Sequence, residues 1–175
     1  MNKKFYSISL SFIFYLISFQ GNSATYYSRI NGNWATATTW SLVSCSGVAA
    51  GSIPTASDNV IICSGRTVTM NGAPGSCLSL TINGTANWTS VSTTNVGAGG
   101  LILNNGSSIT GTVAGNLTVS GPMTVSTGGT TTIGNVVLNV TGLTSINGSF
   151  NDNNAGGANT FADVNLNLGG SFNNT

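Results

Sequence analysis

The amino-acid sequence predicts an all-β protein that folds as a right-handed parallel β-helix, a β-solenoid in which successive coils stack along one axis. Runs of valine, leucine and isoleucine recur along the chain, and glycine or asparagine interrupts each run within a few residues. Charged residues make up 4% of the chain, against roughly 25% in ordinary globular domains. Stacked coils bring equivalent side chains to about 4.8 Å, where ionised groups repel and asparagine amides hydrogen-bond. The 24 glycines suit the corners that each coil needs.

A β-sandwich is the alternative fold, because hairpins between short strands also alternate apolar and polar residues. The low charge favours the solenoid. About 150 residues follow the export signal described next, which is enough for one core, so we expect a single continuous structural unit.

Residues 1–24 are predicted to be a secretory signal peptide. Lys3 and Lys4 precede an apolar run from Phe5 to Phe19, which gives way to small and polar residues. The run is shorter than the roughly 20 apolar residues that a membrane-spanning helix needs. Cleavage after Ser23 places Gly21 and Ser23 at the two small-residue positions, whereas cleavage after Ala24 leaves the bulkier Asn22 at one of them, so Ser23 is slightly favoured over Ala24. We therefore expect a secreted or outer cell-surface protein with no membrane span in the mature chain.

Removal of the signal leaves two arginines and three aspartates, a net charge of −1, so neither nucleic acid nor an anionic membrane is an expected partner. The chain has no histidine and no glutamate, so we expect no catalytic residue, no metal site and no cofactor. Asp152 and Asp163 are the only carboxylates close in sequence. They could meet on adjacent coils as a glycosidase pair, but loop solvation, or a calcium ion held together with backbone carbonyls, is favoured over hydrolysis.

Residues 25–76 are predicted to form an N-terminal cap and the first strands. Trp34 and Trp40 are expected to plug the end of the solenoid core. Asp58 stands where a loop becomes a strand, so its carboxylate is expected to cap loop amides or to pair with Arg66. Residues 59–63 and 66–70 are predicted to form a β-hairpin across the Ser-Gly link between them.

Three cysteines in the exported part allow one disulfide and leave one thiol over. Cys63 and Cys77 both border strand-like runs, so a Cys63–Cys77 bond is our first expectation. Cys45 with Cys63 is nearly as plausible, and the sequence does not choose between them.

Residues 77–175 are predicted to be solenoid coils. Strand centres fall near Leu80, Leu103, Val119, Leu138 and Leu166, at intervals of 16 to 28 residues. Within the strands, one set of alternate residues is expected to point inward: Val136, Leu138 and Val140, and then Val164, Leu166 and Leu168. The sequence ends partway through a further apparent coil, so we expect this chain to be a truncated part of a longer protein.

Residues 34–40, 53–62, 65–70 and 78–85 together resemble the opening coils of secreted Bacteroidetes-type surface proteins. They are also similar to the domain family named for its eight conserved glycines, found where right-handed β-helices begin. The resemblance covers roughly residues 31–90. It implies a large exported protein, often adhesin-like, that is sorted to the surface by a C-terminal domain.

Three functions follow as hypotheses. The first is a structural or adhesive surface module without enzymatic activity, whose partners would be glycans or other surface proteins. The alternative is a carbohydrate-binding or polysaccharide-processing β-helix, with Trp88, flanked by Asn87 and Thr89, as a partly exposed sugar contact. The third is ice binding through threonine ladders, for which residues 67–69 and 130–132 supply Thr-x-Thr. Their unequal spacing favours ordinary strand threonines instead.

Overall fold

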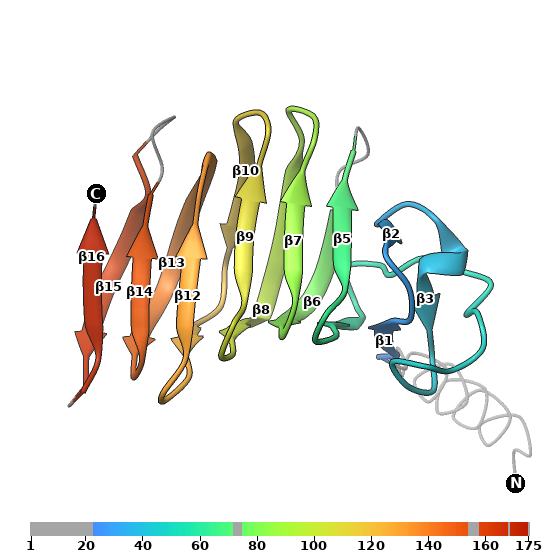
Figure 1. Cartoon of the computed structure of the whole chain (residues 1–175), viewed down its shortest axis with the longest axis horizontal. Coiled ribbons are helices and arrows are strands. Elements are labelled where there is room, and N and C mark those ends of the chain that lie inside the picture. Colours follow the sequence, from blue (N-terminus) through green and yellow to red (C-terminus); the bar gives the residue numbers. More distant parts are fainter. Residues whose placement is uncertain (1–22, 72–74, 154–157, 168, 175) are drawn as a thin grey trace, which may run out of the picture.

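The computed structural model describes residues 23–71, 75–153, 158–167 and 169–174, and strands account for nearly all of their regular structure. One short 3-10 helix, η1 (Ala37–Thr39), is found in these residues. The strands wind into a right-handed solenoid whose axis runs along the length of the molecule (Figure 1). Strands of neighbouring coils pair in parallel, which confirms the predicted β-solenoid and excludes the β-sandwich.

Two parallel sheets run the length of the solenoid. Sheet A contains nine strands: β1 (Thr25–Ser28), β3 (Trp40–Ser41), β4 (Asn59–Ile62), β6 (Gly75–Ile82), β8 (Thr93–Leu103), β10 (Gly115–Val119), β11 (Met123–Val125), β13 (Val136–Ile146) and β15 (Thr160–Leu166). Sheet B contains seven: β2 (Gly32–Asn33), β5 (Thr67–Met70), β7 (Thr85–Trp88), β9 (Ser108–Gly111), β12 (Thr130–Ile133), β14 (Ser149–Asp152) and β16 (Ser171–Asn174). The pair β1–β3 is antiparallel.

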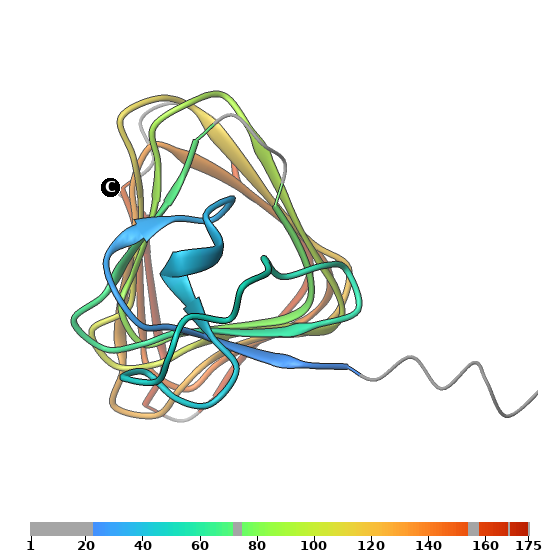
Figure 2. The same ribbon diagram turned by 90° about the vertical axis from the view of Figure 1, so that its right-hand side faces the viewer.

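Sheet A bends partway along its strands, so the solenoid has three faces and a triangular outline (Figure 2). The strand register shifts between Cys77 and Ser79 where β6 pairs with β8, and between Val140 and Leu143 where β13 pairs with β15. In the coil between β8 and β13, the bend falls between two separate strands, β10 and β11. We call the two halves of sheet A the first and second faces in chain order; sheet B is the third.

The hairpin predicted for residues 59–63 and 66–70 is wrong. Strand β4 pairs in parallel with β1 and β6 in sheet A, whereas β5 pairs with β2 and β7 in sheet B. A tight turn does join them: the Arg66 N–H donates to the Cys63 carbonyl at 3.0 Å, and Gly65 has a φ of +69°. The turn residues indicate a sharp change of direction, but they do not indicate which strand becomes the partner. Here the chain turns a corner between two faces.

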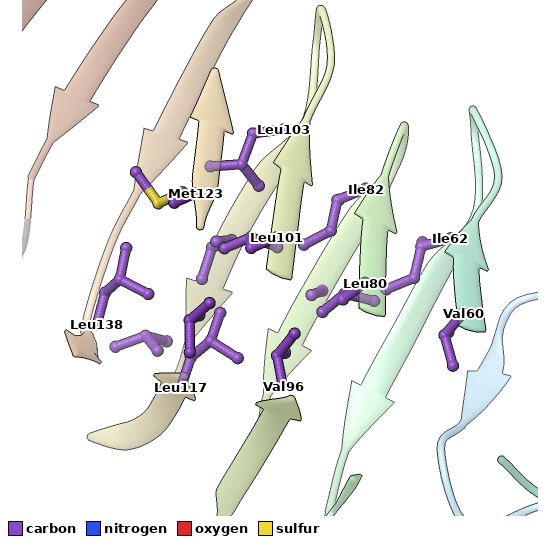
Figure 3. Close-up of a cluster of buried hydrophobic side chains, with 14 of the residues drawn as sticks. Val60, Ile62, Leu80, Ile82, Val96, Leu101, Leu103, Leu117, Met123 and Leu138 are labelled. Carbon is purple, nitrogen blue, oxygen red and sulfur yellow. The ribbon is translucent and has the colours of Figure 1, made fainter. Parts of the chain in front are cut away.

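The core consists of inward-pointing columns in which each coil contributes the equivalent residue. On the second face one column contains Val60, Leu80, Leu101 and Met123, and the next contains Ile62, Ile82, Leu103, Val125 and Ile146. Figure 3 shows most of these side chains stacked along the solenoid axis. All are buried, as are Val136, Leu138 and Val140 on the first face, which confirms the alternation predicted for that strand.

Two inward-pointing residues of the last coil were expected to be buried, but they are exposed. Val164 and Leu166 continue the two columns of the second face in register, but they are 45% and 54% exposed because no described coil lies over them. Leu168, predicted to share their direction, lies outside the described residues. The predicted strand position is therefore right, while the predicted burial of this strand is not.

Asparagines stack at the corner that follows the second face, as the low charge of the sequence suggested. The Asn104 side-chain amide donates to Asn83 Oδ1 at 2.6 Å, and the Ser126 hydroxyl donates to Asn104 Oδ1 at 2.6 Å. Asn167 donates to Asn147 in the same way. Neutral amides thus link successive coils where ionised side chains would repel one another.

Candidate functional site

The two tryptophans belong to the buried core, as predicted: Trp34 directly follows β2 and Trp40 begins β3, both in the N-terminal coil. Trp40 is fully buried and Trp34 is 3% exposed. Their rings meet edge to face with centroids 5.2 Å apart, and Trp40 Nε1 donates to the Trp34 carbonyl at 2.8 Å. Both indoles fill the core end and present no ring to solvent.

Asp58 caps loop amides, the first of the two roles predicted for it. Its Oδ2 accepts from the Thr55 N–H at 2.9 Å and from the Thr55 hydroxyl at 2.7 Å, and its Oδ1 accepts from the Ala24 N–H at 3.0 Å. Burial alone would raise the pKa of this carboxyl, but the hydrogen bonds from Thr55 and Ala24 outweigh it, so the pKa lies below its ordinary value. Its partners are these groups, and Arg66 is not among them.

Replacing Asp58 with asparagine is expected to lower the free energy of unfolding by about 1–3 kcal/mol at neutral pH, because charge-assisted hydrogen bonds are lost. A carboxyl whose folded pKa is depressed stabilises the fold fully above its ordinary pKa of 3.8 and loses that effect as the pH falls below it. The difference between wild type and variant should therefore shrink below pH 3.8. Urea unfolding across this pH range measures it.

The exposed Asp163 supplies the matched control. Its change to asparagine should alter stability by less than about 0.5 kcal/mol at any pH. An equal loss in both variants, or a loss from Asp58→Asn that persists in acid, would contradict the capping role.

The disulfide joins Cys45 to Cys63, so the first expectation of a Cys63–Cys77 bond is wrong and the alternative holds. Register explains the outcome. Val60 pairs with Leu80 and Ile62 with Ile82, so Cys63 lies at a corner of the second face. Cys77 instead points into the core from the first face, in register with Val96. It is a free thiol, and burial raises its pKa to about 12.

Trp88 is fully buried, which corrects the expected partial exposure. It pairs with Met70 in the inward column of sheet B, and its ring fills space left open by Gly115, where an added Cβ would lie 2.1 Å from Trp88 Cδ1. The polar neighbours that suggested exposure point outward, since residues alternate along a strand. Alternation of Ala86 and Trp88 with polar residues was the signal that indicated burial. Trp88 therefore offers no platform for a sugar ring.

Asp152 and Asp163 do not form a carboxylate pair. Asp152 continues an inward column of sheet B next to Ile133, is 6% exposed, and accepts from the Asn159 side-chain amide at 2.6 Å. Asp163 lies on the exposed side of β15 in sheet A, in register with Leu143. The two carboxyls belong to different sheets, one inside and one outside, so they do not flank a common bond.

The outward side of sheet B carries neutral polar side chains in rows, and we call it the sheet B face. Its central row runs without interruption over six coils: Thr67, Thr85, Ser108, Thr132, Asn151 and Asn173. A second row flanks it in the N-terminal half: Asn33, Thr69, Asn87 and Thr110. A third flanks it in the C-terminal half: Thr130, Ser149 and Ser171. The two Thr-x-Thr segments considered for ice binding, residues 67–69 and 130–132, thus lie on one face.

Hydrogen bonds along these rows hold several of the side chains in place. The Thr110 hydroxyl donates to Asn87 Oδ1 at 3.1 Å, and the Ser171 hydroxyl donates to Ser149 at 3.1 Å. The Asn173 amide donates to Asn151 Oδ1 at 2.8 Å. This register could not be predicted from the sequence, because loops of different lengths separate the strands of sheet B.

Comparison with protein-family models, with curated proteins and with solved structures finds no match. In the described part of the chain, no three histidine, cysteine, aspartate or glutamate residues gather as metal ligands. The same residues include no helix that is both long and apolar enough to cross a bilayer.

Proposed function

We propose that this chain is a secreted, cell-surface structural or adhesive module that makes contact through the sheet B face. The continuous central row on that face carries the proposal. It repeats a hydroxyl or amide at every coil from β5 to β16, and no charged residue belongs to any of its three rows.

Such a face suits adhesion to an extended surface better than binding of a single small molecule. Each hydroxyl or amide contributes one weak hydrogen bond, and a rigid array lets many of these form together at little entropic cost. The buried columns beneath the strands fix the spacing of the array. Since no charges take part, binding should depend little on ionic strength.

Two features support export. Residues 1–24 carry the composition of a secretory signal, although residues 1–22 lie outside those the structure describes. The Cys45–Cys63 disulfide supports an oxidising compartment, where such bonds persist. Carbohydrate recognition by a stacked tryptophan loses its main support, because Trp88 is buried.

Co-sedimentation of the full chain with insoluble particles tests the adhesive role, using cellulose, chitin and intact bacterial cells. We expect at least one particle to retain the chain at both low and high salt. The double variant Thr85→Tyr/Thr132→Tyr places two rings on the central row and should abolish retention.

The matched control, Thr81→Tyr/Thr124→Tyr, makes the same changes on outward positions of the second face. It should bind as the wild type does. Retention of no particle, or equal loss in both double variants, would count against adhesion through the sheet B face.

A further inference from the structure

The sheet B face is periodic in two directions. Neighbouring strands repeat about every 4.8 Å along the axis, and alternate residues along one strand lie roughly 6.6 Å apart. Each of six coils presents a serine or threonine followed two residues later by a threonine or asparagine: Thr67 and Thr69, Thr85 and Asn87, Ser108 and Thr110, Thr130 and Thr132, Ser149 and Asn151, Ser171 and Asn173. The pairs are in register over β5, β7 and β9 and again over β12, β14 and β16, and between β9 and β12 they move by two residues. The face is thus a two-dimensional array of hydroxyls and amides in which the central row is continuous and the flanking row changes side at mid-length.

The lattice is regular because sheet B does not bend. None of its described strand pairings contains a register shift, whereas two pairings of sheet A do. Six of its outward residues are threonines, whose branched side chains are stiff at χ1. The hydrogen bonds between Asn151 and Asn173 and between Asn87 and Thr110 further restrict side-chain rotation.

The chemistry of the face excludes several kinds of ligand. No arginine or lysine stands in its rows to recognise phosphate or carboxylate, and no aromatic ring stands there to stack on a sugar. The rows present neutral hydroxyl donors and acceptors interspersed with methyl groups. These groups repeat with the strand spacing along the axis and with the spacing of alternate residues along each strand. Those repeats are close to the two repeats of the oxygen lattice on a prism face of hexagonal ice.

We propose that the sheet B face binds ice. Hydroxyl and amide groups hold a first layer of water at lattice positions, and the threonine methyls occupy the spaces between those waters. The inference rests on the proposed adhesive function, because it names the surface to which the sheet B face adheres.

The other faces lack the complete lattice. The second face carries Ile61, Ile102 and Leu143 among its outward residues, and Ile102 and Leu143 are 41% and 46% exposed. The first face has one polar row, but Val137 interrupts the row beside it and the sheet bends at its edge. Only on sheet B does one polar row run over six coils with a second polar row beside it on every coil, on one side from β5 to β9 and on the other from β12 to β16.

Two measurements on the full chain test the proposal: inhibition of ice recrystallisation, and partitioning of the protein into a slowly growing ice hemisphere. The wild type is expected to inhibit recrystallisation and to enter the ice. Thr85→Tyr/Thr132→Tyr should lose both activities, while Thr81→Tyr/Thr124→Tyr should keep both. Circular dichroism and thermal unfolding establish that the two double variants are equally folded.

Exclusion of the wild type from ice, or equal loss of activity in the two folded double variants, would overturn the proposal. The particle assay separates this failure from that of the adhesive function. Retention on cellulose, chitin or cells that depends on Thr85 and Thr132, combined with exclusion from ice, rejects ice binding and leaves adhesion standing. Exclusion from ice together with no retention on any particle rejects both.

Discussion

Replacement of Trp88 by alanine is expected to lower the free energy of unfolding by about 3–5 kcal/mol, the usual cost of truncating a buried tryptophan. The indole is fully buried between coils and fills the space above Gly115. Because the backbone on every side belongs to parallel sheets, the surrounding coils have little freedom to collapse into the cavity. Urea unfolding monitored by circular dichroism measures the loss.

Two further variants isolate the cause of this effect. The Trp88 Nε1–H has no hydrogen-bond partner within the described part of the chain, so phenylalanine removes an unsatisfied donor, keeps a ring in the core and should cost less than alanine does. Val91, three residues away and 77% exposed, should tolerate alanine within about 0.5 kcal/mol. Near wild-type stability of Trp88→Ala would contradict the buried position.

Removal of the disulfide through Cys45→Ala/Cys63→Ala is expected to lower the free energy of unfolding by about 3 kcal/mol, as expected for a closed loop of this size. The two cysteines are 18 positions apart, and the chain between them contains no helix or strand until it reaches β4. Reduction of the wild type should produce the same loss, and reduction should leave the double variant unchanged.

The buried Cys77 provides the control for this prediction. Cys77→Ala keeps the bond and should cost only about 1 kcal/mol, a typical value for a small core change. Alkylation before and after denaturation should detect one thiol, reactive only once the chain unfolds. A non-reduced peptide that links Cys63 to Cys77 would contradict the pairing.

The fold could be predicted from the sequence because the solenoid repeats one simple rule. Alternating apolar residues placed strands at Leu80, Leu103, Val119, Leu138 and Leu166, and all five positions lie in strands. Each strand alternates inward and outward residues, so the period of two along it is enough to identify these segments without knowledge of their partners.

Partner choice was harder to predict, because it depends on register between distant residues. Tight turn chemistry at Gly65 suggested a hairpin, but the strands on either side pair with other coils. The same limit applies to Cys77, whose strand-like surroundings said nothing about which face it occupies. For the same reason the sheet B face could not be predicted. Thr67 and Thr132 can be assigned to one row only when the lengths of the corner loops between their strands are known.

Every described strand pairing apart from β1–β3 joins successive coils, so the backbone hydrogen bonds run along the solenoid axis. A pull along that axis would place the full force on every coil boundary, so the weakest boundary would open first. The sheet B face lies alongside the axis, so a body attached there would pull across it and share the force among many coils. The solenoid should therefore resist shear along the sheet B face better than stretching between its ends.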